Sequence, residues 1–115
     1  MMTNSLIILH SSPESADNRA FTAVRLAGAL LADNKDVVMF LVEEGAKLAD
    51  QKLEKDNASR DLFYEMMEMG MQVLICGATM RKMGWEEAYL LPGVTKSSMK
   101  ALSMLMSEAS EIVTF

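Results

Sequence analysis

The sequence predicts an α/β fold: a single doubly wound domain over residues 1–115, with helices on both faces of a mostly parallel sheet of four to five strands. Short apolar runs of strand length alternate with segments whose apolar residues keep a helical spacing, as in parallel β-α units. Half of the 115 residues are hydrophobic, which is enough for one compact core. No repeat, linker or low-complexity tract divides the chain.

The first half of the chain contains two apolar strands separated by one helix. Residues 5–10, "SLIILH", end at the turn-forming "SSPES", as expected for a strand buried on both faces. Apolar residues then recur at helical spacing over residues 20–31. "DNKD" interrupts this helix, and the valine-rich "VVMFLV" at 37–42 predicts the second strand. The polar segment "EEGAKLADQKLEKDN" that follows predicts a loop with a short helix.

The second half repeats the alternation with shorter elements. Helical spacing returns over residues 62–69, after a candidate cap at Asn57 or Ser59 and before a stop at Gly70. "QVLIC" is the third strand, and residues 79–90 predict a short helix. "LPGV" predicts a break, residues 99–109 a last amphipathic helix, and "EIVTF" a closing strand.

The order of the strands decides which residues meet. In the common doubly wound order 2-1-3-4 the winding reverses between the first and third strands, and ligands bind beside that reversal at the carboxyl ends of the strands. His10 ends the first strand and Cys76 ends the third, so this order brings the two together. Glu43, Glu44 and Gly45 follow the second strand and border the same edge.

Composition excludes several classes of protein. The formal net charge is -5 and cationic pairs are short and local, so we expect no nucleic-acid partner. The single cysteine forbids an internal disulfide and fits a reducing cytoplasm. No apolar run approaches the ~20 residues that cross a bilayer, and "MMTNS" lacks the basic start of a signal peptide. The 12 methionines are most simply core filling, with an adaptable binding surface as the alternative.

Cys76 is the candidate reactive group. A thiol reacts as the thiolate, which a helix N-terminus or neighbouring cations stabilise. Gly77 and Ala78 leave room around the sulfur, Thr79 is a candidate cap, and two cations follow in the expected opening turns of the helix. These cations are Arg81 and Lys82, and Gly84 then lets the chain turn away. The alternative is that Cys76 is a small apolar residue at the end of a buried strand.

The remaining motifs limit the kinds of reaction and ligand that the sequence supports. A second cysteine in a C-x-x-C motif is missing, so any thiol cycle must finish on another molecule. His10 is either a proton acceptor or ion-pair partner for the thiolate, or a solvated loop residue. One Cys and one His do not make a structural zinc site, and dinucleotide and P-loop fingerprints are absent. We therefore expect no metal and no cofactor. Trp85 and Tyr89 suit either a partner anchor or core packing.

The sequence resembles the DsrE/DsrF-like family of small sulfur-relay proteins, which includes the TusD-type subunits. The resemblance spans nearly the whole chain and rests on the apolar N-terminal strand, "FLVEEGAKLA" at 40–49, "ICGATMRKMG" at 75–84 and the ending "GVTKSSMKALSMLMSEASEIVTF". In sulfur-transferring members a cysteine at the end of the third strand precedes small residues, basic residues and a glycine. The positions in register here are Cys76, Ala78, Arg81, Lys82 and Gly84.

This resemblance implies a doubly wound fold, homotrimers or homohexamers, and exchange of sulfur with partner donor and acceptor proteins. The leading hypothesis is a cytoplasmic sulfur carrier with a persulfide on Cys76. Its supporting residues are His10, Glu44, Gly77, Thr79, Arg81 and Lys82. Two alternatives remain: a non-catalytic oligomeric or regulatory subunit, and a small-ligand-binding module of the same fold.

Overall fold

The computed structural model describes residues 4–53 and 56–115. The start of the chain, Met1–Thr3, and Glu54 and Lys55 of the charged loop lie outside the described residues. The elements in chain order are β1 (Asn4–Leu9), α1 (Arg19–Ala32), β2 (Asp36–Leu41), the 3-10 helix η1 (Glu43–Ala49), α2 (Ala58–Glu68), β3 (Gln72–Cys76), α3 (Gly77–Met83), the 3-10 helix η2 (Glu87–Tyr89), β4 (Val94–Ser97), α4 (Met99–Glu108) and β5 (Glu111–Thr114).

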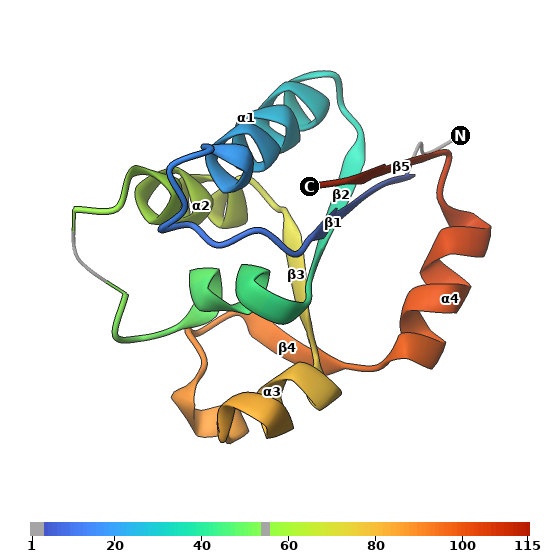
Figure 1. The fold of residues 1–115 in the computed structure, drawn as a ribbon. Coiled ribbons are helices and arrows are strands. Elements are labelled where there is room, and N and C mark those ends of the chain that lie inside the picture. The colour runs from blue at the N-terminus through green and yellow to red at the C-terminus, as the bar shows by residue number, and fades with distance from the viewer. Residues whose placement is uncertain (1–3, 54–55) are drawn as a thin grey trace.

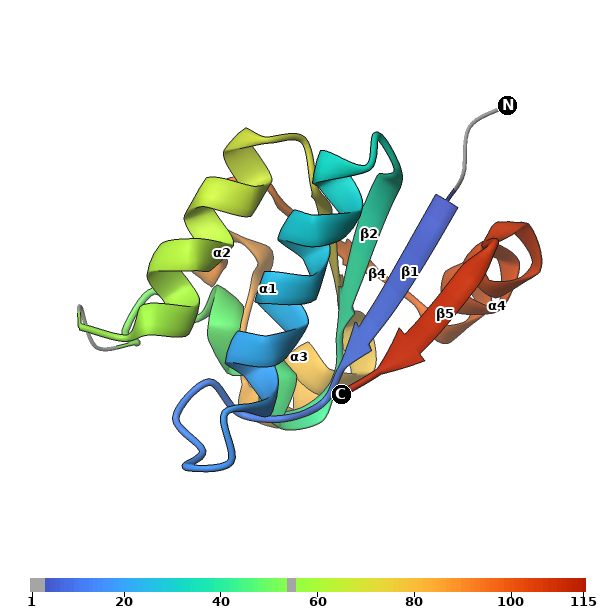
Figure 2. The ribbon, with the colours of Figure 1, turned by 90° about the horizontal axis from the view of Figure 1, so that it is seen from above.

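The strands form one five-stranded sheet in the order β4-β3-β2-β1-β5, and every pairing in it is parallel (Figure 1). Helices cover both faces, α1 and α2 on one side and α4 on the other (Figure 2). The predicted α/β class with a doubly wound parallel sheet is therefore confirmed.

The strand order 2-1-3-4 is wrong, because β2 lies between β1 and β3. The chain steps in one direction from β1 to β4 and then returns over the opposite face through α4 to place β5 on the free side of β1. A right-handed crossover that travels in the reverse direction puts its helix on the other face, which explains the position of α4. Winding therefore reverses at β1, two strands away from Cys76.

Two elements differ from the sequence prediction. β4 was not predicted: it begins at Val94, the last residue of the predicted break "LPGV", and its mostly polar sequence "VTKS" is half-buried or exposed at the edge of the sheet. The helix predicted over residues 79–90 begins earlier and ends at Met83, since Gly84 adopts a left-handed φ of 73°. Only the short η2 follows it.

The predicted ends of α2 are confirmed. The side chain of Asn57 accepts a hydrogen bond from the Arg60 N–H at 3.1 Å, and Gly70 follows the helix with a φ of 106°. Ser98 caps α4 in the same way, accepting from the Ala101 N–H at 3.1 Å. This cap fixes the start of α4 directly after β4.

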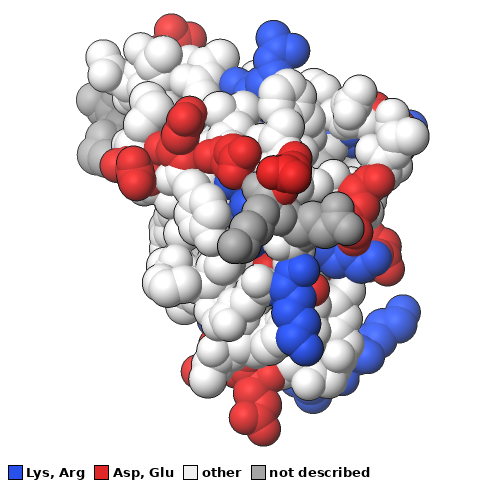
Figure 3. Space-filling model, turned by 90° about the vertical axis from the view of Figure 1, so that its left-hand side faces the viewer, with Lys and Arg blue, Asp and Glu red and all other residues white. Residues whose placement is uncertain are grey.

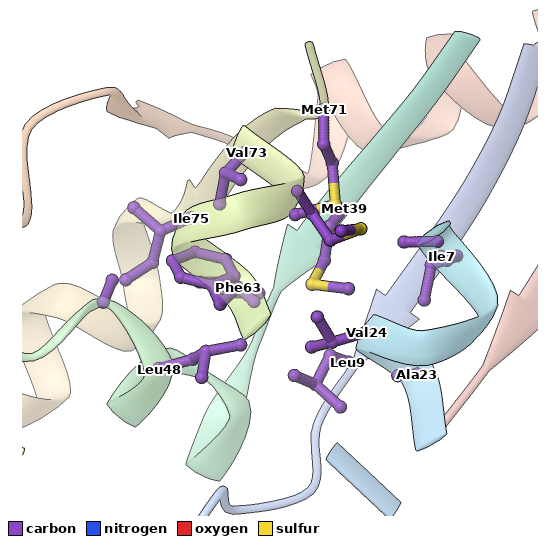
Figure 4. Packing of buried hydrophobic residues seen from close by; sticks show 14 of the residues in the cluster. Ile7, Leu9, Ala23, Val24, Met39, Leu48, Phe63, Met71, Val73 and Ile75 are labelled. Carbon is purple, nitrogen blue, oxygen red and sulfur yellow. The ribbon is translucent and has the colours of Figure 1, made fainter. Parts of the chain in front are cut away.

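The larger core lies between the sheet and the α1–α2 layer (Figure 4). Phe63 from α2 and Val24 from α1 pack there against inward-facing strand residues such as Met39. Four methionines are buried in this core, which confirms core filling for these positions: Met39, Met66, Met71 and Met80. Four others are exposed, at positions 69, 99, 104 and 106. Among the described residues, no helix is long and apolar enough to span a membrane.

A smaller core lies on the other face of the sheet. Its buried members from the strands are Leu6 of β1, Phe40 of β2, and Leu74 and Cys76 of β3. Leu102 of α4 packs with them. Half-buried residues such as Leu105 and Ala109 extend this cluster along α4. The side chain of Cys76 therefore lies on the face of the sheet that α4 covers.

Candidate functional site

Cys76 ends β3 and is also the residue that precedes the first turn of α3. Alternation along β3 sends Leu74 and Cys76 toward α4 and sends Val73 and Ile75 toward the α1–α2 layer. The thiol is unbonded to another cysteine, and the residue is 3% exposed. One side of Cys76 is therefore packed against hydrocarbon, as the core-filling alternative requires.

The other side of Cys76 borders an open hollow of about 330 Å³. The hollow lies where the start of α3, the end of β4 and the start of α4 meet, and its lining is Cys76, Gly77, Ala78, Arg81, Lys96, Ser97, Ser98 and Met99. Two cations and two hydroxyl groups are among these side chains, and none of the lining residues is acidic. The hollow therefore combines a thiol with groups that attract an anion.

Lys96 is the lining residue that the sequence did not indicate. The Cα of Cys76 pairs with Ser97 in the register of β3 and β4, so Lys96 comes one residue before the pair. A Cβ on Gly77 would lie 3.0 Å from Cε of Lys96 and 3.3 Å from the carbonyl oxygen of Ser97. The stem of Lys96 therefore passes over the backbone directly after the cysteine. The signal that could have revealed Lys96 is a strand at "VTKS", which its polar sequence conceals.

Thr79 has a different role from the predicted cap. It is a buried residue within α3, and the position before that helix is occupied by Cys76, whose backbone is extended. The Thr79 Oγ1 accepts a hydrogen bond from the Glu43 N–H at 3.2 Å. Glu43 begins η1 with a positive φ of 50°. Thr79 therefore ties α3 to the segment that follows β2.

Arg81 and Lys82 lie in the last turn of α3, and their predicted place in its opening turns is wrong, because α3 begins at Gly77 and spans only seven residues. Arg81 is four residues beyond Gly77 and so shares its side of the helix, where it lines the hollow. Lys82 is exposed and is not part of the lining.

His10 and Glu44 do not line the hollow at Cys76. His10 is exposed directly after β1, and the whole of β2 separates that strand from β3. The expected convergence of His10 with Cys76 is therefore wrong, and its cause is the strand order. Glu44 is exposed and forms an ion pair with Lys47 at 2.8 Å, which raises the pKa of Lys47 through a hydrogen bond to the Glu44 carboxylate.

Other parts of the described chain offer less chemistry. Among residues 4–53 and 56–115, no group of three or more His, Cys, Asp or Glu residues is placed to hold a metal ion. Figure 3, which faces the left-hand side of Figure 1, shows acidic and basic side chains together on this surface. The Trp85 and Tyr89 rings lie 5.1 Å apart beside η2, and the Tyr89 hydroxyl donates to Asp50. Both aromatic residues thus pack locally, outside the hollow at Cys76.

A comparison with protein families shows which family this chain belongs to. The model of the DsrE/DsrF-like family matches residues 4–115. The chain belongs to this family. Two proteins of similar length are related to this chain in sequence. The MK0008 protein of Methanopyrus kandleri is 26% identical over 111 residues, covering 95% of this chain and 91% of that protein. The MJ0989 protein of Methanocaldococcus jannaschii is 27% identical over 111 residues, covering 95% and 96%.

Solved structures share this DsrE-like fold. The ychN protein from E. coli superimposes with a TM-score of 0.86 and 21% identity, over 99% of this chain and 100% of that one. The MTH1491 protein from Methanobacterium thermoautotrophicum superimposes with a TM-score of 0.71 and 18% identity, over 98% and 99%. At these identities the likeness establishes the fold, and the chemistry must be argued from the residues at Cys76.

Proposed function

We propose that this protein is a sulfur carrier that holds sulfane sulfur as a persulfide on Cys76 and passes it to a partner protein. The observation that carries the proposal is the position of Cys76, the only thiol of the chain, in the wall of an open hollow lined by two cations. Membership of the DsrE/DsrF-like family, which is generally associated with sulfur relay, supports the same function.

Each transfer step exchanges one sulfur atom and leaves one thiolate behind. The Cys76 thiolate attacks the terminal sulfur of a donor persulfide, R–S–SH; the new bond joins Cys76 Sγ to that sulfur, and R–S⁻ leaves. An acceptor thiolate then attacks the terminal sulfur of Cys76–S–SH, takes the sulfur and its proton, and releases the Cys76 thiolate. No net oxidation occurs, so one cysteine is sufficient.

The side chains around Cys76 suggest a division of roles. Arg81 and Lys96 provide positive charge at the rim, which attracts an anionic donor and stabilises the departing anion. Gly77 lets the stem of Lys96 lie against the backbone next to the cysteine, and Thr79 positions α3 through its hydrogen bond with Glu43. Lys82, Glu44 and His10 have no part in this step, because they do not line the hollow.

The proposed carrier acts as a homo-oligomer, a trimer or hexamer, in a reducing compartment such as the cytoplasm, where the thiol stays free. The α4 side of the molecule exposes apolar residues outside the hollow that a second copy would cover: Met104, Met106 and Ile112. Donor and acceptor proteins would then approach the hollow at the edge of the sheet.

Mass spectrometry of the intact protein tests the carrier function. After incubation with a small persulfide, the native protein should gain one sulfur atom, about 32 Da, and Cys76→Ser should gain none. A thiol-bearing acceptor should then remove the added mass. The same experiment on urea-unfolded protein controls for access: uptake only after unfolding would contradict the proposal.

A non-catalytic subunit is the second candidate, and the 3% exposure of Cys76 favours it. In that case Cys76→Ser would keep the oligomer and the activity of its host complex unchanged. Loss of sulfur uptake together with loss of the host activity would exclude this second function.

A further inference from the structure

The hollow beside Cys76 is small and positively charged. Its volume of about 330 Å³ is near the lower end of small-molecule sites, roughly 300–1,000 Å³. It therefore suits a compact ligand. The two cations come from different elements, Arg81 from α3 and Lys96 from β4, so they approach the opening from two sides.

Lys96 is held close to the cysteine by its stem. Cε of Lys96 comes within 3.0 Å of the position that a Gly77 Cβ would take, so the aliphatic chain lies against the peptide next to Cys76. Its ammonium group is 4.0 Å from the Glu87 carboxylate, and the two side chains are 45% and 71% exposed. An ion pair this long and this exposed is weak, which leaves Lys96 able to bind another anion.

We propose that Lys96 is a specificity-determining residue that makes the hollow prefer sulfur donors carrying an oxyanion, a carboxylate or a sulfonate, close to their sulfane sulfur. This inference rests on the proposed function and names the substrate class of the same site. The oxyanion contacts Lys96 and Arg81 while the sulfane sulfur faces Cys76. Glu87 competes with the donor for Lys96.

Two alkylating probes of similar size measure this preference without any sulfur transfer. Iodoacetate carries a carboxylate and iodoacetamide a neutral amide, and both alkylate Cys76 with release of iodide. The measured quantity is the alkylation rate with iodoacetate divided by the rate with iodoacetamide. This ratio is then divided by the same ratio for free cysteine. Lys96→Met should lower this normalised ratio about fivefold, the effect of a partly exposed charge pair, and added salt should shrink the difference.

Matched variants separate charge selection from a change in packing. Lys96→Arg should keep the ratio, and Glu87→Gln should raise it by freeing Lys96. Lys52→Met removes the same charge from an exposed position outside the hollow and should leave the ratio unchanged. An unchanged ratio in Lys96→Met, or an equal fall in Lys52→Met, would overturn the inference. So would a native protein in which neither probe reaches Cys76.

Sulfur donors identify the oxyanion and keep the two proposals distinguishable. The persulfides of mercaptopropionate, mercaptoethanesulfonate and mercaptoethanol present a carboxylate, a sulfonate and a neutral hydroxyl. Faster uptake from either charged donor, lost in Lys96→Met, supports the inference and shows which oxyanion is preferred. Equal uptake from all three donors overturns the role of Lys96 and leaves the carrier function standing. An alkylation ratio that depends on Lys96, without any sulfur uptake, overturns the carrier function and leaves the selection of anions by Lys96 standing.

Discussion

At the scale of single residues, the hydroxyl of Thr79 forms a hydrogen bond that joins α3 to the start of η1. Its Oγ1 accepts the Glu43 N–H at 3.2 Å from a buried position within α3. Glu43 holds a left-handed backbone there, which a non-glycine residue adopts at a cost. The hydrogen bond therefore fixes a strained turn against the helix that carries Arg81.

Replacing Thr79 with valine should lower the free energy of unfolding by about 1–2 kcal/mol, because the Glu43 N–H loses its acceptor while the shape of the side chain is kept. Urea denaturation followed by far-UV circular dichroism measures this difference. Thr79→Ser restores the acceptor and should recover most of the loss. Equal destabilisation by serine and valine would mean that the methyl packing, and not the hydrogen bond, holds Thr79.

How far the site could be predicted depends on whether each residue is local to Cys76 in sequence. Cys76, Gly77 and Arg81 were identified from one short motif, and the structure places all three at the hollow. Lys96 was missed because only the pairing of β3 with β4 brings it there. His10 was wrongly placed for the same reason: its position relative to Cys76 depends on a strand order that local spacing does not encode.

At the scale of elements, β5 is fastened to the sheet by an ionic contact at its first residue. The Glu111 carboxylate accepts hydrogen bonds from the Lys35 ammonium at 2.7 Å and from the Ser5 hydroxyl at 2.7 Å. These hydrogen bonds, that from Lys35 foremost, lower the pKa of Glu111 from its ordinary value of 4.5. The carboxylate thus connects β5 with β1 and with the turn before β2.

We expect this contact to stabilise the fold at neutral pH and to weaken in acid. Because the pKa is lowered in the folded state, the stabilisation is present above pH 4.5 and disappears as pH falls through the folded value. Glu111→Gln should therefore be less stable than the native protein at pH 7, and the difference should shrink below pH 4.5. Denaturant titrations across this range, with exposed Glu65→Gln as the control, measure it. A difference that grows in acid would contradict the assignment.

The elements that the sequence predicted well are those with a strong apolar period. The apolar runs of β1, β2 and β3 and the spacing in α1 and α2 show most of the residues that are buried, whereas α4 buries only Leu102 of its predicted apolar face. β4 was missed because an exposed edge strand has no buried face to impose alternation, so "VTKS" looks like a loop. The end of α3 was missed because Gly84 stops the helix in a segment whose later residues still favour helix.

At the scale of the whole molecule, the two faces of the sheet are covered unequally. Figure 2 shows α1 and α2 over one face and α4 alone over the other. Apolar side chains are correspondingly exposed on the α4 side, with Met104 at 60% and Ile112 at 42%. The class of the fold could be predicted because β-α alternation specifies parallel crossovers, but the order of the strands depends on tertiary packing.

This uneven cover places the proposed oligomer interface on the α4 side. Met104→Glu should reduce the molecular mass measured by sedimentation toward that of the monomer, because it would bury a charge between subunits. Met69→Glu is the matched control, since Met69 is 55% exposed at the end of α2, on the opposite layer. Native protein that sediments as a monomer, or equal dissociation by both variants, would contradict this location.

The packing of Cys76 beneath α4 also has a consequence for how fast its sulfur can react. Only Leu102 of that ten-residue helix is buried, so α4 can lift from the sheet at less cost than the whole molecule can unfold. The thiol thus lies beneath a helix that buries a single residue. The rate of sulfur transfer would then depend on how often α4 opens locally. A docking protein could raise this rate by holding α4 in its open position.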